Sequence, residues 1–181
     1  MARVILITGG CRSGKSDYAR RLAESMPGRR AYIATCPPDV DEEMRARIRR
    51  HRAARAAAGW DTIEETIDLA RALDAAATHD VVLVDCLTLW VGNLLYEAER
   101  RGAAVAEDDV VDRCGQVLAA CRARPGTVLF VTNEVGMGVV PASAMARVYR
   151  DLVGRSNQTF AAGADAVTLL VCGIPLPLKG K

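Results

Sequence analysis

The sequence has little lysine, with only three lysines against 21 arginines. Lys15 is the only lysine before position 179. Because arginine is the default basic residue here, an isolated lysine indicates a site that needs a compact ammonium rather than a planar guanidinium. The same scarcity excludes the N-K-x-D guanine-binding motif of Ras-like switch proteins, since no lysine lies between positions 15 and 179.

Long hydrophobic runs and a strong net charge are also absent. No apolar run approaches the roughly 20 residues that a membrane-spanning helix needs, so we expect no transmembrane segment. The formal net charge of +2 is nearly balanced and does not indicate a nucleic-acid partner. The first predicted strand follows directly after Met1-Ala2-Arg3, so we expect no signal peptide and a cytoplasmic location.

The six cysteines form no C-x-x-C pair, and their spacing is not typical of metal ligands. We therefore expect them to remain reduced and to act mainly as small hydrophobic residues. No internal repeat or low-complexity linker divides the chain, and 181 residues suit one domain, residues 1–181, with a full core.

A complete glycine-rich phosphate-binding loop occupies residues 9–16, Gly-Gly-Cys-Arg-Ser-Gly-Lys-Ser. The apolar, β-branched segment Val4–Thr8 precedes it, and apolar residues at helical spacing follow it. A strand, a glycine loop and a helix in this order direct backbone N–H groups toward the phosphates of a nucleotide. We expect Lys15 to reach the β- and γ-phosphates and the Ser16 hydroxyl to bind Mg²⁺.

Apolar segments alternate with helical patterns along the whole chain. The predicted strands are 4–8, 31–34, 81–85, 128–132 and 167–171, with 60–65 as a possible edge strand. The predicted helices are 15–25, 41–58, 68–77, 88–101, 107–124 and 142–162. Near-continuous apolar strands separated by helices predict an α/β fold with a mostly parallel sheet covered by helices on both faces. Ligands of such sheets bind beyond the carboxyl ends of the strands.

Asp85 ends the apolar strand Val81–Asp85. This is the Walker-B pattern, in which a carboxylate positions Mg²⁺ directly or through a water molecule. An aspartate at a strand end can also be a simple turn or cap residue. The phosphate-binding loop in the same chain favours the magnesium role.

The predicted helix 41–58 carries six arginines and His51 within residues 41–55. The spacing by itself favours a solvated basic helix whose histidine closes an apolar stripe. The alternative is that neutral His51 attacks phosphorus and passes on a nucleotidyl group through a P–N intermediate. Neighbouring arginines would then bind the triphosphate and keep the histidine neutral by like-charge repulsion.

Two further polar segments have no assigned role from their pattern. Asn133 and Glu134 follow a predicted strand and open a glycine-containing loop, residues 132–141, on the same face of the sheet as the phosphate-binding loop. The alternative is a turn with a polar rim. Residues 154–158, Gly-Arg-Ser-Asn-Gln, interrupt an amphipathic helix. The alternative to a functional role is solvent exposure or a subunit contact.

Five motifs occur in order along nearly the whole chain, at residues 9–16, 32–35, 41–51, 132–141 and 154–158. Together they closely resemble the bifunctional adenosylcobinamide kinase/adenosylcobinamide-phosphate guanylyltransferase family of cobalamin biosynthesis. The histidine-bearing helix and the Asn-Glu-Val-Gly loop are more specific than the phosphate-binding loop. Some members carry Glu where this chain has Asp85, and a second His where it has Arg50.

The resemblance implies a RecA-like P-loop NTPase fold, a homotrimer and two reactions. The first phosphorylates adenosylcobinamide with ATP or GTP. The second transfers GMP from GTP to that phosphate through a guanylylated histidine, which gives adenosylcobinamide-GDP. The position of that histidine falls on His51. The implied nucleotide contacts are Gly9, Gly10, Cys11, Arg12, Ser13, Gly14, Lys15, Ser16, Ala34, Thr35, Cys36, Arg52, Ala53, Ala54, Arg55, Glu64 and Asp85.

Two other functions remain open on the residues alone. A P-loop small-molecule kinase would use the basic helix as a lid and form no covalent intermediate. A nucleotide-driven switch would have a conformation as its product, although the missing N-K-x-D motif argues against a Ras-like one.

Overall fold

A computed structural model describes residues 1–37, 42, 49, 52–53 and 55–180. The candidate nucleophile His51 and the nucleotide contact Ala54 lie outside these residues. So does most of the predicted helix 41–58.

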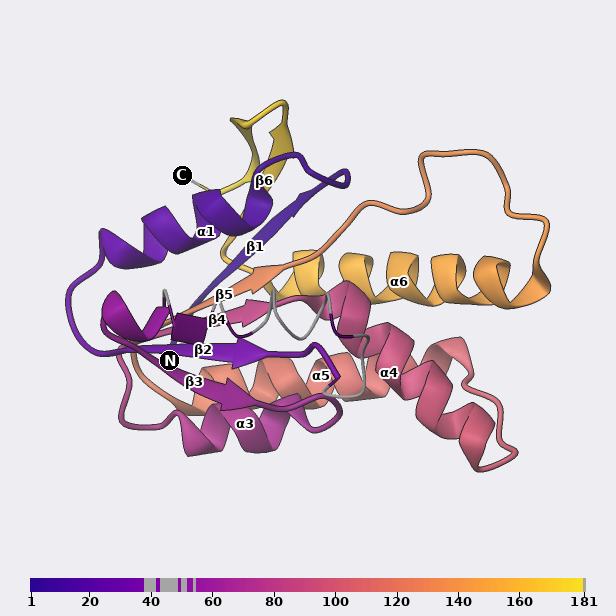
Figure 1. The fold of residues 1–181 in the computed structure, drawn as a ribbon, viewed down its shortest axis with the longest axis horizontal. Coiled ribbons are helices and arrows are strands. Elements are labelled where there is room, and N and C mark those ends of the chain that lie inside the picture. The colour runs from indigo at the N-terminus through magenta and orange to yellow at the C-terminus, as the bar shows by residue number, and fades with distance from the viewer. Residues whose placement is uncertain (38–41, 43–48, 50–51, 54, 181) are drawn as a thin grey trace.

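A seven-stranded sheet in the order β3-β2-β4-β5-β1-β6-β7 forms the centre of the molecule (Figure 1). All neighbouring strands pair in parallel except β6 and β7, which are antiparallel. The strands are β1 (Arg3–Gly9), β2 (Arg30–Ala34), β3 (Trp60–Glu64), β4 (Val81–Asp85), β5 (Thr127–Val131), β6 (Ala166–Val171) and β7 (Ile174–Lys179).

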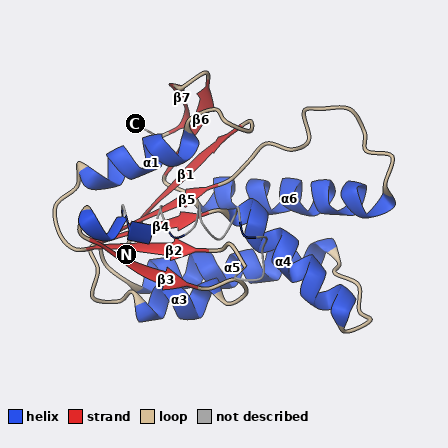
Figure 2. Cartoon of the chain, viewed as in Figure 1, coloured by secondary structure: helices blue, strands red, loops and turns tan. Residues whose placement is uncertain are grey.

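Helices cover both faces of the sheet (Figure 2). They are α1 (Lys15–Glu24), α3 (Leu69–Ala75), α4 (Leu87–Arg100), α5 (Glu107–Ala123) and α6 (Ala144–Gly163). Alternate strand residues point to opposite faces. Ile5 and Ile7 of β1 therefore join the core beneath α1, whereas Val4 and Leu6 join the core shared with α3, α4, α5 and α6. The mostly parallel α/β fold of P-loop NTPases is confirmed.

The structure adds detail at both edges of the sheet. The possible edge strand is confirmed as β3, which pairs in parallel with β2. Strand β7 was not predicted, because Pro175 and Pro177 obscure its pattern. It lies at the other edge, where proline is tolerated in a sheet. Among the helices that the structure describes, none is long and apolar enough to cross a membrane.

Candidate active site

The phosphate-binding loop joins β1 to α1 and is held in shape by its own lysine. Lys15 Nζ donates to the carbonyl oxygen of Gly10 at 2.6 Å and lies 3.4 Å from Ser13 Oγ. The Lys15 side chain is buried, with 7% exposure. This burial lowers the pKa of Lys15, while nearby Cys11, Cys86 and Asp85 oppose the shift. The ammonium is thus desolvated before any ligand arrives, which strengthens its attraction for phosphate.

Two glycines of the loop are required by geometry. At Gly9, φ is +149° and an added Cβ would lie 2.4 Å from the carbonyl oxygen of Leu170. Gly14 caps α1 in the left-handed conformation with φ 93°, which other residues rarely adopt. The β6–β7 turn braces the loop, because the N–H of Gly173 donates to the carbonyl oxygen of Ser13 at 2.9 Å.

A cavity of about 730 Å³ opens beside the loop at the carboxyl ends of β2, β4 and β5. It has the position that the parallel sheet predicts for a ligand. The residues that line it are Cys11, Arg12, Ser13, Gly14, Lys15, Ser16, Asp17, Arg20, Tyr32, Ala34, Cys36, Arg55, Asp85, Cys86, Leu89, Val131 and Asn133.

Asp85 lies in this cavity and is oriented by a tyrosine. The hydroxyl of Tyr32 donates to Asp85 Oδ2 at 3.0 Å. Burial, together with the charge of Asp85, raises the pKa of Tyr32 well above its ordinary value. The phenol therefore stays protonated at neutral pH and remains a donor. Asp85 Oδ1 has no partner among the residues that the structure describes, so one carboxylate oxygen is left for a ligand.

Arg55 connects the basic segment to the cavity. Its Cζ lies 3.9 Å from the centroid of the Tyr32 ring, within the range of a cation–π interaction. Trp60 packs edge-on against Tyr32, with 6.2 Å between the ring centroids. Nearby, Arg52 Nη1 and Glu64 Oε1 form an ion pair at 2.9 Å between two exposed side chains.

The structure gathers most of the predicted nucleotide contacts around this cavity, but not all of them. Arg52, Ala53 and Glu64 are exposed and do not line it, and neither do Gly9 and Gly10 of the loop. Thr35 is buried beneath it, where its hydroxyl donates to the carbonyl oxygen of Cys86 at 2.9 Å and accepts from the Cys86 N–H at 2.8 Å. Thr35 thus holds the ends of β2 and β4 together and does not line the cavity.

Several cavity residues were missed in the sequence, above all Tyr32, and Asn133 was identified there only as a polar group at the end of a strand. A signal for Tyr32 was present, since it is two residues before the predicted contact Ala34 on the same strand and so faces the same side. Asn133 follows β5, and the carboxyl ends of parallel strands meet at one edge. Arg20, Leu89 and Val131 line the cavity without any pattern that would have identified them.

The two polar segments that the sequence left without a role, residues 132–141 and 154–158, contact each other. Ser156 and Asn157 of α6 are buried, so solvent exposure is the wrong explanation for these two residues. Thr132 Oγ1 donates to Asn157 Oδ1 at 2.6 Å, and Asn157 Nδ2 donates to the carbonyl oxygen of Asn133 at 3.0 Å. The loop after β5 is therefore fastened to α6 by side-chain hydrogen bonds.

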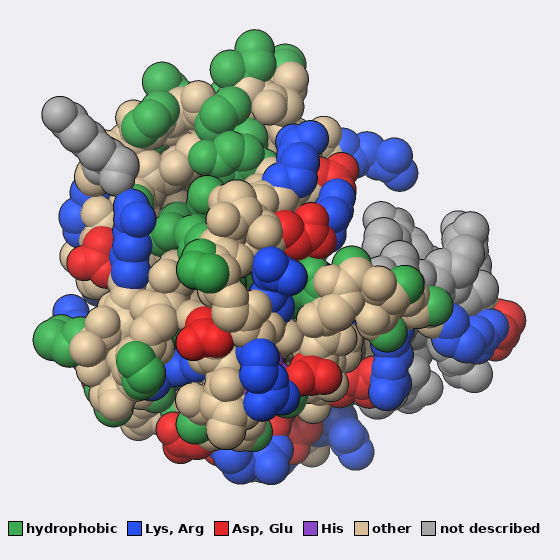
Figure 3. Space-filling view, turned by 90° about the vertical axis from the view of Figure 1, so that its left-hand side faces the viewer, with side chains coloured by type: hydrophobic (Ala, Val, Ile, Leu, Met, Phe, Trp, Pro, Cys, Tyr) green, Lys and Arg blue, Asp and Glu red, His purple; other side chains and the backbone are tan. Residues whose placement is uncertain are grey.

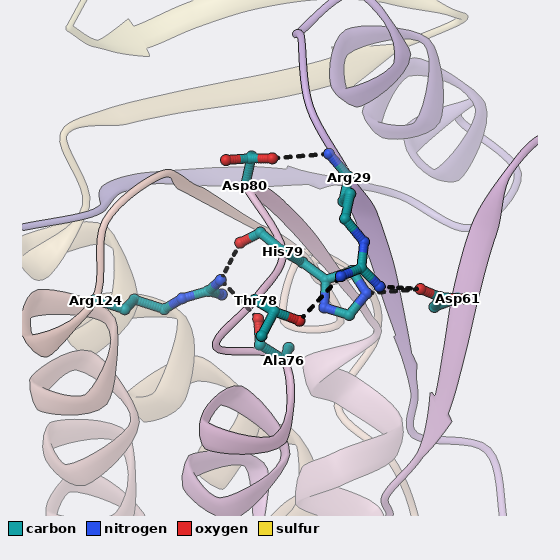
Figure 4. Close-up of polar contacts among 7 residues, drawn as sticks. All are labelled: Arg29, Asp61, Ala76, Thr78, His79, Asp80 and Arg124. Atoms are coloured by element: carbon teal, nitrogen blue, oxygen red, sulfur yellow. Dashed lines mark hydrogen bonds and ion pairs between the residues drawn. The ribbon is translucent and has the colours of Figure 1, made fainter.

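His79 lies just before β4, at the end of the sheet opposite the phosphate-binding loop. Figure 4 shows that its ring points toward Asp61 of β3. His79 Nε2 and Asp61 Oδ2 are 2.8 Å apart, and Arg29 Nη2 lies 3.2 Å from the same oxygen. Arg124, the residue that follows α5, completes the cluster, because its guanidinium donates to the carbonyl oxygens of Ala76 and His79. The histidine is buried, with 8% exposure, and joins β3 to β4.

Asp61→Asn should lower the free energy of unfolding at neutral pH. It should also reduce the amount by which that free energy falls as the pH is lowered. The hydrogen bond from His79, followed by that from Arg29, lowers the pKa of Asp61 in the folded state. Its stabilising contribution is therefore full above the unfolded-state value of about 4 and declines as the pH falls below it. Denaturant unfolding of both proteins between pH 3 and 7 measures this. If the free energies of unfolding of the two proteins changed with pH in parallel, the Asp61 carboxylate would not have this stabilising role.

Comparison with known proteins confirms the family resemblance. The sequence model of the family described as cobinamide kinase / cobinamide phosphate guanyltransferase matches residues 5–178. The chain is 42% identical to the bifunctional adenosylcobalamin biosynthesis protein CobU of Salmonella typhimurium, over 97% of this chain and 99% of that protein. It is 40% identical to the protein of the same name from Escherichia coli, with the same coverage. It is also 41% identical to the bifunctional adenosylcobalamin biosynthesis protein CobP of Pseudomonas aeruginosa, over 97% of each chain. The chain belongs to the cobinamide kinase / cobinamide phosphate guanyltransferase family.

Proposed function

We propose that this chain phosphorylates adenosylcobinamide with ATP or GTP and then transfers GMP from GTP to the adenosylcobinamide phosphate. The observation that carries this proposal is the cavity in which Lys15, Ser16 and Asp85 meet, in a chain whose family is named for a kinase and a guanyltransferase.

The kinase step requires positioning and charge stabilisation more than covalent chemistry. The N–H groups of the loop and the N-terminus of α1 would hold the phosphates. The buried ammonium of Lys15 would stabilise negative charge on the transferred phosphoryl group. The oxygen of the substrate hydroxyl forms a bond to the γ-phosphorus as the bond to the leaving nucleoside diphosphate breaks, and the hydroxyl proton is released to solvent.

Ser16 and Asp85 suit a magnesium ion. Hydroxyl and carboxylate oxygens are the donors that Mg²⁺ prefers, and this ion usually binds one or two protein groups together with phosphate and water. Within the described ranges, no group of three or more His, Cys, Asp or Glu side chains is placed to hold a metal, which fits an ion completed by substrate. When bound, Mg²⁺ neutralises charge on the phosphates.

The guanylyltransferase step would use His51 as the nucleophile. Its neutral imidazole forms a P–N bond with the α-phosphorus of GTP, and pyrophosphate leaves. A phosphate oxygen of adenosylcobinamide phosphate then attacks the same phosphorus, and the P–N bond breaks to regenerate the imidazole. The place of Arg55 over Tyr32 in the cavity supports this step, because Arg55 follows His51 by four residues.

Incubation with α-labelled GTP, Mg²⁺ and adenosylcobinamide tests the proposal. We expect label bound covalently to the protein, followed by labelled adenosylcobinamide-GDP. Phosphorylated adenosylcobinamide without any labelled protein would favour the kinase that lacks a covalent step. Nucleotide hydrolysis with neither product would favour a switch.

Asp85→Asn should lower activity by about 10- to 100-fold, as expected when a group that positions a metal is altered. More Mg²⁺ should be needed for half-maximal rate, because the amide carries no charge. Folding stability should change little, since the amide oxygen can still accept from the Tyr32 hydroxyl. Steady-state rates across a Mg²⁺ titration measure the effect. An unchanged titration would make Asp85 a structural residue.

The proposal includes a homotrimer of single-domain chains located in the cytoplasm. Exposed hydrophobic side chains support a subunit contact, and some of them gather over the β6–β7 hairpin at the top of Figure 3. Ile174, Leu176 and Leu178 of β7 are 69%, 52% and 57% exposed. Light scattering after size-exclusion chromatography would measure the oligomeric state.

A further inference from the structure

We propose that Asn133 is a catalytic residue of the kinase step, where its side-chain oxygen accepts a hydrogen bond from the attacking hydroxyl of the substrate. This inference rests on the proposed function. It assigns a role to the segment 132–141 that nucleotide binding and Mg²⁺ binding leave unused.

The sheet places Asn133 between the two groups that handle the phosphates. Strand β5 lies between β1, which leads into the phosphate-binding loop, and β4, which ends at Asp85. Val131, the last residue of β5, is opposite Ile7 on one side and Asp85 on the other. The chain then continues beside β1, because the N–H of Glu134 donates to the carbonyl oxygen of Gly9 at 3.1 Å. Asn133 therefore lines the cavity just after the strand that lies between β1 and β4.

Hydrogen bonds hold Asn133 at both its backbone and its side chain. Its carbonyl oxygen accepts from the buried Asn157 at 3.0 Å. Its Nδ2 donates to Thr88 Oγ1 at 2.9 Å. Thr88 is itself buried, and its carbonyl oxygen accepts from Tyr149 at 3.1 Å. A carboxamide fixed in this way is preorganised, so binding a substrate would cost little ordering of this side chain.

One side-chain atom of Asn133 remains available. Among the residues that the structure describes, Oδ1 has no hydrogen-bond partner, although Asn133 lines the same cavity as Lys15 and Asp85. An amide oxygen only accepts hydrogen bonds. It therefore suits a substrate hydroxyl and does not suit a phosphate oxygen, which is also an acceptor.

The chemistry assigned to Asn133 is orientation and not proton abstraction. An amide oxygen is too weak a base to take the hydroxyl proton, but a hydrogen bond to it would direct an oxygen lone pair toward the γ-phosphorus. Because the amide is neutral, it adds no repulsion against the triphosphate. A carboxylate at this position would repel it.

Asn133→Ala tests the inference in the full-length protein. We expect kcat for phosphorylation of adenosylcobinamide to fall by about 10- to 100-fold, the scale of a lost orienting contact. The Kd for ADP should stay within about twofold, because the lost contact is to the acceptor. ATP hydrolysis without acceptor should fall less than phosphoryl transfer, since water does not depend on that contact. A purely structural role would lower both rates together.

Two further variants sharpen the result. Thr88→Val removes the group that fixes the Asn133 amide, so it should lower kcat, and adding it to Asn133→Ala should cause little extra loss. Gln158→Ala removes an exposed amide and should leave the kinetics unchanged. Should Asn133→Ala fail to fold, Asn133→Ser serves instead, because its short hydroxyl keeps the site polar without reaching as far.

The outcomes separate this inference from the proposed function. A wild-type protein that does not phosphorylate adenosylcobinamide overturns both. An active wild type together with an Asn133→Ala variant of nearly normal kcat overturns only the role of Asn133. Equal losses of transfer, hydrolysis and ADP binding would also overturn it, because they would indicate damage to the phosphate-binding loop.

Discussion

Lys15→Ala should lower the rates of both half-reactions by at least about 10²- to 10³-fold, the usual cost of removing one preorganised group that stabilises transition-state charge. Both reactions should be affected because the phosphate-binding loop is the only phosphate-binding motif in the sequence. Lys15 is buried and bonded to Gly10, so the variant also loses a contact that shapes the loop. Separate assays of ATP-dependent phosphorylation and of GMP transfer to preformed phosphate measure the two effects.

Lys179→Ala is the matched control for that experiment. Lys179 Nζ donates to the carbonyl oxygens of Ala161 and Ala162 at the end of α6, outside the cavity. Its removal should leave both rates unchanged. If Lys15→Ala retained full activity in either half-reaction, a second and independent phosphate site would have to exist.

His51→Asn should eliminate the covalent GMP adduct and GMP transfer while phosphorylation of adenosylcobinamide continues. Only the second reaction needs a protein nucleophile, since γ-phosphoryl transfer depends on positioning and electrostatics. Mass spectrometry of the wild type after incubation with GTP and Mg²⁺ should place the adduct on His51. The bond should be labile in acid and stable in base, as a P–N bond is.

His79 provides the comparison for His51. His79→Asn should leave the adduct intact, because this residue lies at the opposite end of the sheet. The variant should nevertheless unfold more easily than the wild type, since His79 is buried and bonded to Asp61. An adduct that persists in His51→Asn, or that maps to another residue, would move the nucleophile elsewhere.

All the strands except β7, together with the phosphate-binding loop, could be predicted because their signals are local. Residues 9–16 specify a loop between a strand and a helix, and Asp85 could be located from four apolar residues before it. The order of strands could not be derived in this way. Placing β5 between β1 and β4 depends on contacts between distant segments, and this placement brings Asn133 into the site.

The burial of Asn157 and the role of Tyr32 could not be predicted either, because both depend on residues that are distant in the sequence. Asn157 looks like a surface residue in the sequence, yet it is buried because Thr132 and Asn133 supply partners for its amide. Only a satisfied hydrogen-bonding group is tolerated in such a position, and those partners are more than 20 residues away. Tyr32 likewise gained its role from Asp85 on the neighbouring strand.

The prolines of β7 restrict how copies of this chain can join. Val171 and Ile174 close a two-residue turn and are opposite each other, so they form a hydrogen-bonded pair. Hydrogen bonding alternates along antiparallel strands, so Pro175 and Pro177 face the open edge, where neither has an N–H to donate. At these two positions a strand from another molecule would find carbonyl oxygens that accept hydrogen bonds but no N–H groups that donate them. This edge is therefore protected against the strand-to-strand pairing that leads to aggregation. Any contact between subunits on this side has to form through packing of side chains.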